Sequence, residues 1–468
     1  MTTLTMKFGG TSVGSPEAIA GVVRIVEEEV QRGSKVVVVT SAMSGVTDAL
    51  LATAREAAAG NRWVYLSTSQ KLRDRHTEVA NMLINPGNER KAVIDEIDAL
   101  IEQHVELCNA VNILGETTPR ITDAIISFGE RLSSRVLAGA LRSQGVNARQ
   151  FDASQFVITN DDFGSAIPYW DETETRIREN FLPLLDQNIT PVVTGFIGGN
   201  RRGHFTTLGR GGSDYSGAIF AALTDSSELI IWTDVDGVMT TDPRVDKRAR
   251  VLSSVSYQEV GELAFYGAKV LHPKTVQPIL NKNIPMRVRN TFNPTHPGTL
   301  ITRIAEPTDT VVKAVTGIRN VSLLTVSGKG MMGVPGIAGR TFSATAHAGT
   351  SILMISQASS EQSFCFVVPQ DQAQGVKDKI EAELRLEIAK QDVDSVDILN
   401  DIAVVTVVGA GMRGTPGVAG RVFSTMGGQG INVIAIAQGA SECSISFVIA
   451  EADRERTVLA LHELALMS

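Results

Sequence analysis

The stretch Lys7-Phe8-Gly9-Gly10-Thr11-Ser12-Val13 follows a short apolar segment and decides how the first part of the chain folds. Apolar residues at positions 4, 6 and 8 suit a strand, and the glycine pair lets the backbone approach a bulky anion. A helix is predicted to start near Ser15-Pro16-Glu17, because serine caps helices and proline suits their first position. Strand, glycine turn and helix start together predict an anion site, to which Lys7 adds a positive charge.

This stretch alone fits an ordinary turn between strand and helix equally well, and it lacks the Gly-x-x-x-x-Gly-Lys-Ser/Thr pattern of a P-loop. Three further clusters of glycine, hydroxyl and charged residues favour the anion site: Thr40–Thr47, Leu208–Ser216 and Trp232–Gly237. Each could be a turn with capping residues. At least two of them follow an apolar strand candidate, and the carboxyl ends of strands are where open α/β sheets bind ligands.

The composition of the 468 residues excludes several classes of protein. A net charge of −8, 5% aromatic residues and no block of lysine and arginine argue against nucleic-acid binding. No apolar run reaches ~18 residues and no charged-then-apolar leader is present, so we expect a cytoplasmic protein. Cys108, Cys365 and Cys443 are too widely spaced for a disulfide framework, and neither cysteine nor histidine spacing predicts a metal site.

The last part of the chain contains an internal repeat. Residues 326–368 align without gaps on 407–449, an offset of 81, with 20 identities in 43 positions. Each copy reads as strand, glycine loop, helix, strand, strand, helix. A unit of this length is too long for a solenoid repeat, so we expect two copies of one small α+β domain.

Before the repeats, about three hundred residues alternate between strand and helix signals, which predicts an α/β fold with a mostly parallel sheet. The strand candidates are 35–40, 191–196, 228–233 and 285–289. Residues 62–118 are rich in helix formers and predict a helical excursion. Residues 291–310 contain three prolines and a glycine and are predicted to be a linker.

Several charged side chains in these clusters could carry chemistry. Arg210 suits a bidentate contact with a carboxylate, and Asp214 suits a metal or an ammonium group. Glu130 lies on or near an apolar helix, where it is either paired with Arg131 or solvated, or buried to receive an ammonium group. Lys269 could bind a phosphate or lie on the surface.

Five motifs occur together in the order typical of the aspartate kinase family: Lys-Phe-Gly-Gly-Thr-Ser at 7–12, Ser-Phe-Gly-Glu-Arg at 127–131, Gly-Arg-Gly-Gly-Ser-Asp at 209–214, Trp-Thr-Asp-Val-Asp-Gly at 232–237 and Ala-Lys-Val-Leu-His-Pro at 268–273. The chain resembles this family over its whole length, and the repeats resemble tandem ACT domains. Residues 357–361 and 438–442 are similar to the regulatory half of bifunctional aspartate kinase–homoserine dehydrogenases. The chain ends at Ser468, so we expect no dehydrogenase portion.

The resemblance implies an amino acid kinase (carbamate-kinase-like) catalytic domain at 1–305 and two ferredoxin-like ACT regulatory domains at 310–395 and 396–468. It implies ATP-dependent phosphorylation of the β-carboxylate of L-aspartate to 4-phospho-L-aspartate, the first step of lysine, threonine and methionine biosynthesis. Mg²⁺ would be held mainly through the nucleotide phosphates. An ionised carboxylate acceptor needs no general base, so the lack of a candidate catalytic histidine agrees with this activity.

The resemblance also assigns site residues. Lys7 and Asp214 are catalytic, Arg210 takes the α-carboxylate of aspartate and Glu130 its ammonium group. The remaining contacts to aspartate are Ser41, Thr47 and Ser213. The nucleotide contacts are Lys7, Gly9, Gly10, Thr11, Thr233, Asp234, Arg244 and Lys269. Met239 departs from the tyrosine that some members carry near the adenine, which leaves base recognition open.

Gln357 and Gln438 occupy matching places in the two repeats, near the close of an apolar strand. A glutamine at a strand end is often satisfied by backbone, but two copies in these surroundings predict contacts to an amino-acid effector. The resemblance favours threonine, with lysine as the alternative, and implies a homodimer through the ACT domains or a tetramer. Two rivals stay open: a kinase for glutamate, acetylglutamate, carbamate or a nucleoside monophosphate, and a non-catalytic amino-acid sensor.

Overall fold

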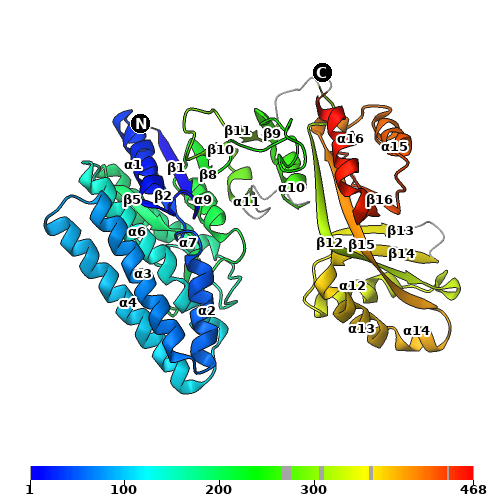
Figure 1. Cartoon of the computed structure of the whole chain (residues 1–468), viewed down its shortest axis with the longest axis horizontal. Helices are drawn as coiled ribbons and strands as arrows, with labels where there is room; N and C mark the ends of the chain where they lie inside the picture. The colour runs from blue at the N-terminus through cyan, green and yellow to red at the C-terminus, as the bar shows by residue number, and fades with distance from the viewer. Residues whose placement is uncertain (1, 266–275, 305–309, 358–361, 440–441, 467–468) are drawn as a thin grey trace. The chain divides into compact units, whose positions relative to one another are not determined.

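The computed structural model describes residues 2–265, 276–304, 310–357, 362–439 and 442–466. It divides into two compact units (Figure 1). Unit 1 comprises Met1–Val238, Ser253–Tyr257 and Leu271–Ile304, and unit 2 comprises Met239–Leu252, Gln258–Val270 and Ala305–Ser468. Two segments that precede the predicted linker therefore belong to the same unit as the repeats.

Unit 1 is built on a sheet that is parallel except at one pair of strands. Its described strands run in the order β3-β5-β2-β1-β8-β10-β11-β9, and only β10 and β11 pair antiparallel. The bounds are β1 Thr3–Phe8, β2 Lys35–Thr40, β3 Ala148–Phe151, β5 Thr190–Thr194, β8 Glu228–Thr233, β9 Ser254–Ser256, β10 Met286–Asn290 and β11 Thr299–Thr302. The predicted α/β class with a mostly parallel sheet is confirmed.

Alternation of side chains gives this sheet two buried faces. Met6 and Phe8 of β1 point to one face, where they join the core formed with α1 (Pro16–Gln31) and α6 (Phe128–Ser143). Val37 and Val39 of β2 point to the other face and pack with α9 (Gly212–Leu223). Helices therefore cover both faces, as parallel sheets require.

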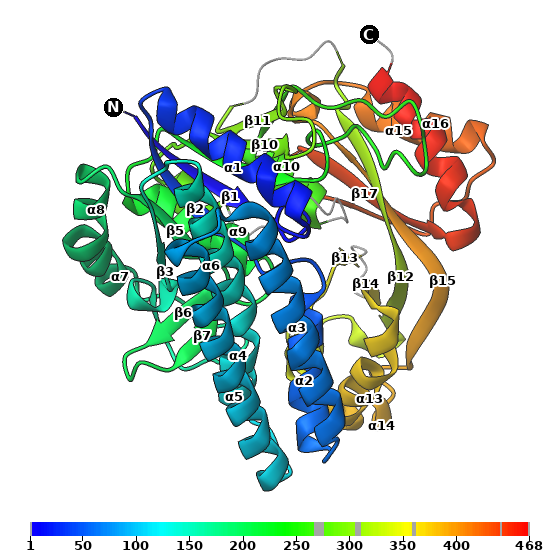
Figure 2. The ribbon, with the colours of Figure 1, turned by 60° about the vertical axis from the view of Figure 1, so that its left-hand side comes forward.

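The start of α1 follows from its sequence. The Ser15 hydroxyl accepts a hydrogen bond from the Ala18 amide at 3.2 Å, and Pro16 is the first helical residue. The predicted helical excursion is also confirmed. It consists of two long antiparallel helices, α3 (Arg62–Leu83) and α4 (Asn88–Leu114), which run side by side next to α2 (Val46–Ala58) in Figure 2.

Smaller elements complete unit 1. β4, β6 and β7 form a separate small sheet beside the main one. The bounds are α5 Pro119–Ile126, β4 Ile158–Thr159, α7 Trp170–Arg176, a π-helical turn Ile177–Phe181, α8 Leu182–Asp186, β6 Ile197–Asn200, β7 Phe205–Thr207 and α11 Gln277–Leu280.

In unit 2 the described strands form one sheet in the order β13-β14-β12-β15-β17-β16. Each repeat follows the predicted order of strand, helix, strand, strand, helix. The bounds are α10 Tyr257–Phe265, β12 Ala314–Ser327, α12 Ile337–His347, β13 Met354–Gln357, β14 Ser363–Pro369, α13 Ala373–Glu383, α14 Arg385–Ala389, β15 Ser395–Val408, α15 Val418–Gly428, β16 Ala435–Gln438, β17 Ser444–Ala450 and α16 Arg454–Leu466.

The two repeats share their long strands. β12 and β15 pair antiparallel, with an irregular register between Ile318 and Leu323. The first half of β12 contributes Val315 to the core of the second repeat, whereas the first half of β15 contributes Val396 to the core of the first. Each repeat therefore completes its core with a strand segment from the other copy.

The predicted linker at 291–310 is wrong in part, because Thr299–Thr302 forms β11 and pairs with β10. Prolines lie on both sides of this short strand, so the composition of the segment indicated a linker rather than a strand.

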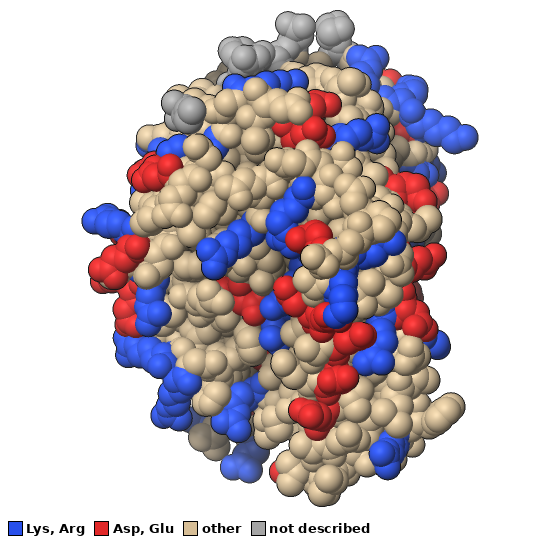
Figure 3. Space-filling view, turned by 90° about the vertical axis from the view of Figure 1, so that its left-hand side faces the viewer, with Lys and Arg blue, Asp and Glu red and all other residues tan. Residues whose placement is uncertain are grey.

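In the part of the chain that the structure describes, no helix combines the length and apolar character needed to cross a bilayer. On the face shown in Figure 3, basic and acidic side chains are interspersed rather than gathered by sign.

Two matching glycines make close backbone contacts that no side chain could share. A Cβ on Gly409 would lie 2.2 Å from the Val311 carbonyl oxygen, and one on Gly328 would lie 2.2 Å from that of Asp392. Gly409→Ala should therefore destabilise unit 2 by about 1–3 kcal/mol, the usual cost of overpacking. Thermal unfolding of the purified chain measures the effect.

Gly420→Ala is the matched control, because Gly420 lies inside α15 with open space around it. Alanine in a helix should leave the melting temperature unchanged or raise it. Equal melting temperatures for the two variants would contradict the predicted clash at Gly409.

Candidate functional site

The ends of four parallel strands meet at one edge of the sheet in unit 1. Phe8, the last residue of β1, is in register with Thr40 on β2 and Trp232 on β8, and Thr40 is in register with Thr194 on β5. The clusters that follow these strands are therefore neighbours. The chain leaves β1 for β2 on one side and pairs with β8 on the other, so β1 marks the switch point where α/β sheets bind ligands.

The glycine turn after β1 packs tightly against the loop after β2. The Ser44 amide donates to the Gly10 carbonyl at 3.0 Å, and a Cβ on Gly10 would lie 3.0 Å from the Ala42 carbonyl oxygen. Arg75 of α3 fixes both loops, since its guanidinium donates to the carbonyls of Gly14 at 2.8 Å and Ser44 at 2.9 Å. Sequence reasoning missed Arg75, which lies in a helix rich in charged residues.

Lys7 and Asp214 form an ion pair at this edge. Lys7 is only 8% exposed, and its stem passes Gly217 of α9, where a Cβ would lie 3.2 Å from the Lys7 Cβ. Asp214 lies in the first turn of α9, which starts at the left-handed Gly211 (φ 72°) without a side-chain cap. The lysine, the carboxylate and the start of α9 therefore lie together at this edge, an arrangement suited to binding a phosphate.

Glu130 lies in the first turn of α6 and is 3% exposed. Its Oε1 accepts a hydrogen bond from the Ala42 amide at 3.2 Å, and its Oε2 has no hydrogen-bond partner among the described residues. Burial raises the pKa of Glu130 to about 8, although the Ala42 amide and the charge of Lys7 favour its ionised form. The structure places it as the predicted buried acid, and its pairing with Arg131 is not seen, since Arg131 pairs with Asp152.

The loop after β7 brings Arg210 and Ser213 to the start of α9. Ser213 packs against the end of β5, because a Cβ on Gly195 would lie 2.9 Å from the Ser213 Cβ. Arg210 is exposed and forms no ion pair with any residue that the structure describes. An unpaired guanidinium is suited to an anionic ligand.

A second residue that sequence reasoning missed is Asp123 on α5. Its carboxylate accepts hydrogen bonds of 2.9 Å from the Thr207 amide, the Thr207 hydroxyl and the Gly164 amide. Burial raises the pKa of Asp123, and these three bonds oppose the shift. Asp123 thus anchors the strand end three residues before Arg210. The only sequence signal was a carboxylate inside a short apolar helix.

The remaining predicted contacts of unit 1 lie at the same edge. Ser41 follows β2, and its amide donates to the Phe8 carbonyl at 3.1 Å. Thr47 lies in the first turn of α2, and Thr11 is exposed in the glycine turn. After β8, the Thr233 hydroxyl donates to the Asp234 carboxylate at 3.2 Å.

Two predicted nucleotide residues are not brought to this edge by the described contacts. Arg244 belongs to unit 2, where its guanidinium donates to both carboxylate oxygens of Asp242. Lys269 lies outside the described residues. Gln357 and Gln438 are exposed at the ends of β13 and β16. Their roles stay predictions, as do those of the residues in unit 1.

The buried acid should make stability depend on pH. Since the pKa of Glu130 rises from 4.5 to about 8 on folding, its contribution is fully present below pH 4.5 and is lost as the pH rises through 8. Glu130→Gln cannot ionise, so the ligand-free variant should exceed wild type in stability at pH 8.5 by on the order of 2–4 kcal/mol, with little difference at pH 5. Urea unfolding at both values measures this difference.

Glu102→Gln, at an exposed position on α4, is the control and should leave the pH dependence unaltered. If Glu130→Gln kept the pH dependence of wild type, the carboxyl would not be buried as described.

Comparison with known proteins agrees with this architecture. Residues 2–290 match the amino acid kinase family, and residues 324–384 and 405–464 match an ACT domain. The chain is 36% identical over 464 residues to the chloroplastic bifunctional aspartokinase/homoserine dehydrogenase 1 of Arabidopsis thaliana, covering 97% of this chain and 50% of that protein. It therefore spans about half the length of the bifunctional relatives that it matches.

Shorter relatives are matched over more of their length. The chloroplastic aspartokinase 3 of Arabidopsis thaliana is 33% identical over 467 residues, with 98% of this chain and 81% of that protein covered. Two structures of E. coli aspartokinase III are 30% identical to this chain. The complex with aspartate and ADP has a TM-score of 0.83 and covers 99% of this chain and 100% of its own. The complex with lysine and aspartate has a TM-score of 0.77, covering 98% and 99%. The chain thus belongs to the aspartokinases, within the amino acid kinase family.

Proposed function

We propose that this chain transfers the γ-phosphoryl group of ATP to the β-carboxylate of L-aspartate. The observation that carries the proposal is the buried carboxylate of Glu130, with one oxygen unpartnered, at the strand edge that also holds the Lys7–Asp214 pair. An ammonium group entering beside Glu130 would satisfy that oxygen. The solved complex of E. coli aspartokinase III with aspartate and ADP supports the same pair of ligands.

The chemistry requires positioning and charge neutralisation rather than proton removal. The β-carboxylate of aspartate is ionised at neutral pH, so it attacks without a general base. Two anions must be brought together, and the developing charge on the phosphoryl group must be balanced. Lys7 supplies a positive charge in a poorly solvated place, and the amides at the start of α9 add their dipoles.

Lys7 is paired with Asp214, which keeps the ammonium group at the end of β1. A phosphate that approaches Lys7 would compete with the Asp214 carboxylate for the ammonium group. Asp214 would then hold Lys7 in position and lie near the Mg²⁺ that accompanies the phosphates. Mg²⁺ would supply further charge neutralisation. Among the described residues, no group of three His, Cys, Asp or Glu side chains is placed to hold a metal. The nucleotide phosphates would therefore provide most of its ligands, with Asp214 and Asp234 in reach of the same edge.

Substrate selection follows from two side chains, Arg210 and Glu130, that have no ion-pair partner among the described residues. Arg210 would take the α-carboxylate of aspartate, and Glu130 its ammonium group. Carbamate lacks the ammonium group, and a nucleoside monophosphate would leave Glu130 facing an anion. For a non-catalytic sensor we would expect Lys7 or Asp214 to be missing, and both are present and paired.

Regulation by an end-product amino acid completes the proposal. The two repeats match an ACT domain, and E. coli aspartokinase III has been solved with lysine. Gln357 and Gln438 are exposed at the ends of edge strands, where an amide can contact a zwitterion. We retain threonine as the first effector to test and lysine as the second, and self-association through the repeats as the mode of assembly.

Lys7→Met should lower kcat by roughly 10²-fold or more with the fold intact, because a preorganised charge at a transferring phosphoryl group is worth a few kcal/mol. The coupled ADP-release assay with aspartate measures kcat, and the melting temperature verifies folding. Lys35→Met, at the opposite end of β2 and paired with Asp186, is the matched control. Wild-type turnover in a folded Lys7→Met protein would refute the catalytic role of Lys7.

Arg210→Ala should raise the KM for aspartate roughly 10- to 100-fold, since a hydrogen bond to a charged group is worth about 1.5–3 kcal/mol. ATP affinity should change little, because the guanidinium is assigned to the acceptor. Steady-state kinetics in both substrates separates the two effects, with Arg202→Ala in an exposed loop as control. An unchanged aspartate KM with weakened ATP binding would place Arg210 on the nucleotide.

A further inference from the structure

Asp123 of α5 is a buried carboxylate that no ion pair explains. Its side chain is 1% exposed, and no basic side chain pairs with it among the residues that the structure describes. Burial raises the pKa of Asp123, so its charged form costs stability unless neighbouring donors offset the loss of water. Such a group is uncommon in a protein interior, which makes its hydrogen-bond partners informative.

The three donors to Asp123 belong to two different segments. Its Oδ2 accepts from the amides of Thr207 and Gly164, and its Oδ1 accepts from the Thr207 hydroxyl, each at 2.9 Å. Thr207 is the last residue of β7, and Gly164 lies between β4 and α7. The two segments are also joined to each other, because the Ala166 amide donates to the Thr207 carbonyl at 2.8 Å. Asp123 therefore fixes the place where β7 ends.

The end of β7 determines where Arg210 begins. Arg210 follows Thr207 after two residues, Leu208 and Gly209. Leu208 is buried, and Gly209 has a left-handed backbone with φ of 76°. A Cβ on Gly209 would lie 3.2 Å from the carbonyl oxygen of Gly164, which belongs to the segment that Asp123 holds. This short connection leaves the backbone before Arg210 little freedom.

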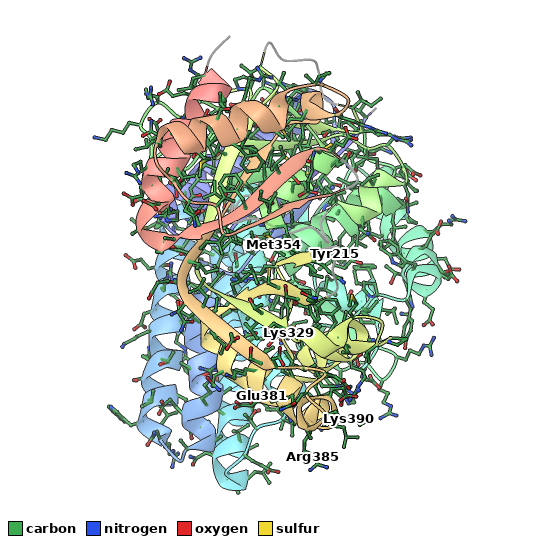
Figure 4. The ribbon with its side chains drawn as sticks, turned by 90° about the vertical axis from the view of Figure 1, so that its right-hand side faces the viewer. Tyr215, Lys329, Met354, Glu381, Arg385 and Lys390 are labelled. Atoms are coloured by element: carbon green, nitrogen blue, oxygen red, sulfur yellow. The ribbon has the colours of Figure 1, made fainter. Side chains whose placement is uncertain are left out.

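The backbone after Arg210 is fixed by α9. The Gly212 amide donates to the Gly209 carbonyl at 2.9 Å. The amide of Tyr215, which Figure 4 labels on α9, donates to the Gly211 carbonyl at 2.9 Å. The main chain of Arg210 is thus held on both sides, while its side chain is exposed and forms no ion pair with a described residue.

The helix that carries Asp123 leads directly to Glu130. α5 ends at Ile126 and α6 begins at Phe128. Ser127 between them is itself helical, and its amide donates to the Asp123 carbonyl at 3.0 Å. Glu130 lies in the first turn of α6. Asp123 therefore connects the segment before Arg210 with the helix that bears the buried acid.

We infer that Asp123 is a positioning residue for the acceptor substrate, which sets the place of Arg210 relative to Glu130. These are the two charges that the α-carboxylate and the ammonium group of aspartate have to match. A displacement of about 1 Å in a binding group can cost on the order of 10²-fold in rate, so a residue that never touches the substrate can decide its selection. The inference rests on the proposed function and deepens it, because it names what fixes the spacing of the substrate contacts.

Steady-state kinetics of Asp123→Ala tests the inference. The KM for aspartate should rise roughly tenfold or more, because Arg210 loses its fixed position. The rise should not exceed that of Arg210→Ala, and the KM for ATP should stay unchanged. A larger effect than that of Arg210→Ala, or an equal rise in both KM values, would overturn the action of Asp123 through Arg210.

Asp123→Asn separates position from charge. Its amide oxygen can accept from the two backbone amides, and its amide nitrogen can donate to the Thr207 hydroxyl oxygen. The aspartate KM of Asp123→Asn should therefore stay within about threefold of wild type, since the hydrogen-bonded geometry is kept. If Asp123→Asn were as impaired as Asp123→Ala, the charge rather than the position would matter, and the inference would be wrong.

Thr206→Val is the matched control, because it also removes a buried polar contact at the end of β7. The Thr206 hydroxyl lies 2.7 Å from that of Thr159, on the side of the strand opposite to Thr207. This variant should keep the wild-type KM for aspartate. If melting curves show that Asp123→Ala does not fold, Asp123→Glu decides instead. It keeps the charge but moves the carboxylate by one methylene group, so the aspartate KM should again rise roughly tenfold or more.

A double-mutant cycle tests whether Asp123 acts through Arg210. In the Arg210→Ala background no guanidinium remains to be positioned, so adding Asp123→Ala should change the aspartate KM by less than about twofold. Effects that multiply in the double variant would overturn the inference. Amide hydrogen exchange gives a readout without substrate, since the Thr207 amide should exchange faster in Asp123→Ala and like wild type in Asp123→Asn. Unchanged exchange in Asp123→Ala would contradict the anchoring of β7.

The same assays separate this inference from the proposed function. If wild type phosphorylates aspartate and a folded Asp123→Ala protein keeps the wild-type aspartate KM, the inference fails alone. Absence of aspartate phosphorylation by wild type would overturn the proposed function itself.

Discussion

The register that pairs β1 with β2 on one side and with β8 on the other determines where the charged groups of unit 1 lie. Phe8 is opposite both Thr40 and Trp232. The glycine turn after β1, the loop after β2 and the Thr233-Asp234 pair after β8 therefore begin at the same height along the strands. A shift by one residue would turn Lys7 away from α9 and towards the face covered by α1 and α6. The position of the site thus depends on the register of β1 with its neighbours. That register is set by the side chains that each strand buries on the two faces of the sheet.

This arrangement concentrates charge where water is scarce. Lys7 approaches from the sheet face covered by α9, whereas Glu130 comes from α6 on the opposite face. Burial destabilises the ionised form of Glu130. Its Oε2 has no hydrogen-bond partner among the described residues that could offset this destabilisation. Such an acid is retained at the expense of stability when a ligand supplies the missing charge. Asp123 and Arg75 show the complementary role, since they use buried or half-buried charges to fix the loops that carry the predicted ligand contacts.

In unit 2 the constraint is different, because the core of each repeat includes a strand segment from the other copy. β12 and β15 each contribute residues to the cores of both copies. The segment Met239–Leu252 and most of α10 also belong to this unit. The buried His462 contacts Thr240 and Asp246 at 2.8 Å each, and Glu259 joins α10 to the second repeat. Parts of the segment that matches the amino acid kinase family are therefore structural members of the unit that holds the repeats.

The sequence by itself determined the elements whose signals are local. Strands 35–40 and 228–233, the cap at Ser15, the helical excursion and the internal repeat follow from periodicity, capping and self-similarity, which neighbouring residues specify. It also identified the residue types of the candidate site, since glycine turns and charges after apolar strands are visible in the chain.

Only the tertiary structure decided what depends on distant partners. β11 inside the proline-rich segment exists because β10 offers it an edge, and the shared strands of the repeats arise from pairs such as Ala314–Val408 and Ser327–Ser395, which lie far apart in the chain. The burial of Glu130, the anchoring by Asp123 and the membership of α10 in unit 2 likewise come from contacts between elements far apart in sequence. Local patterns do not encode such contacts, because burial and pairing energies belong to the assembled fold rather than to any segment.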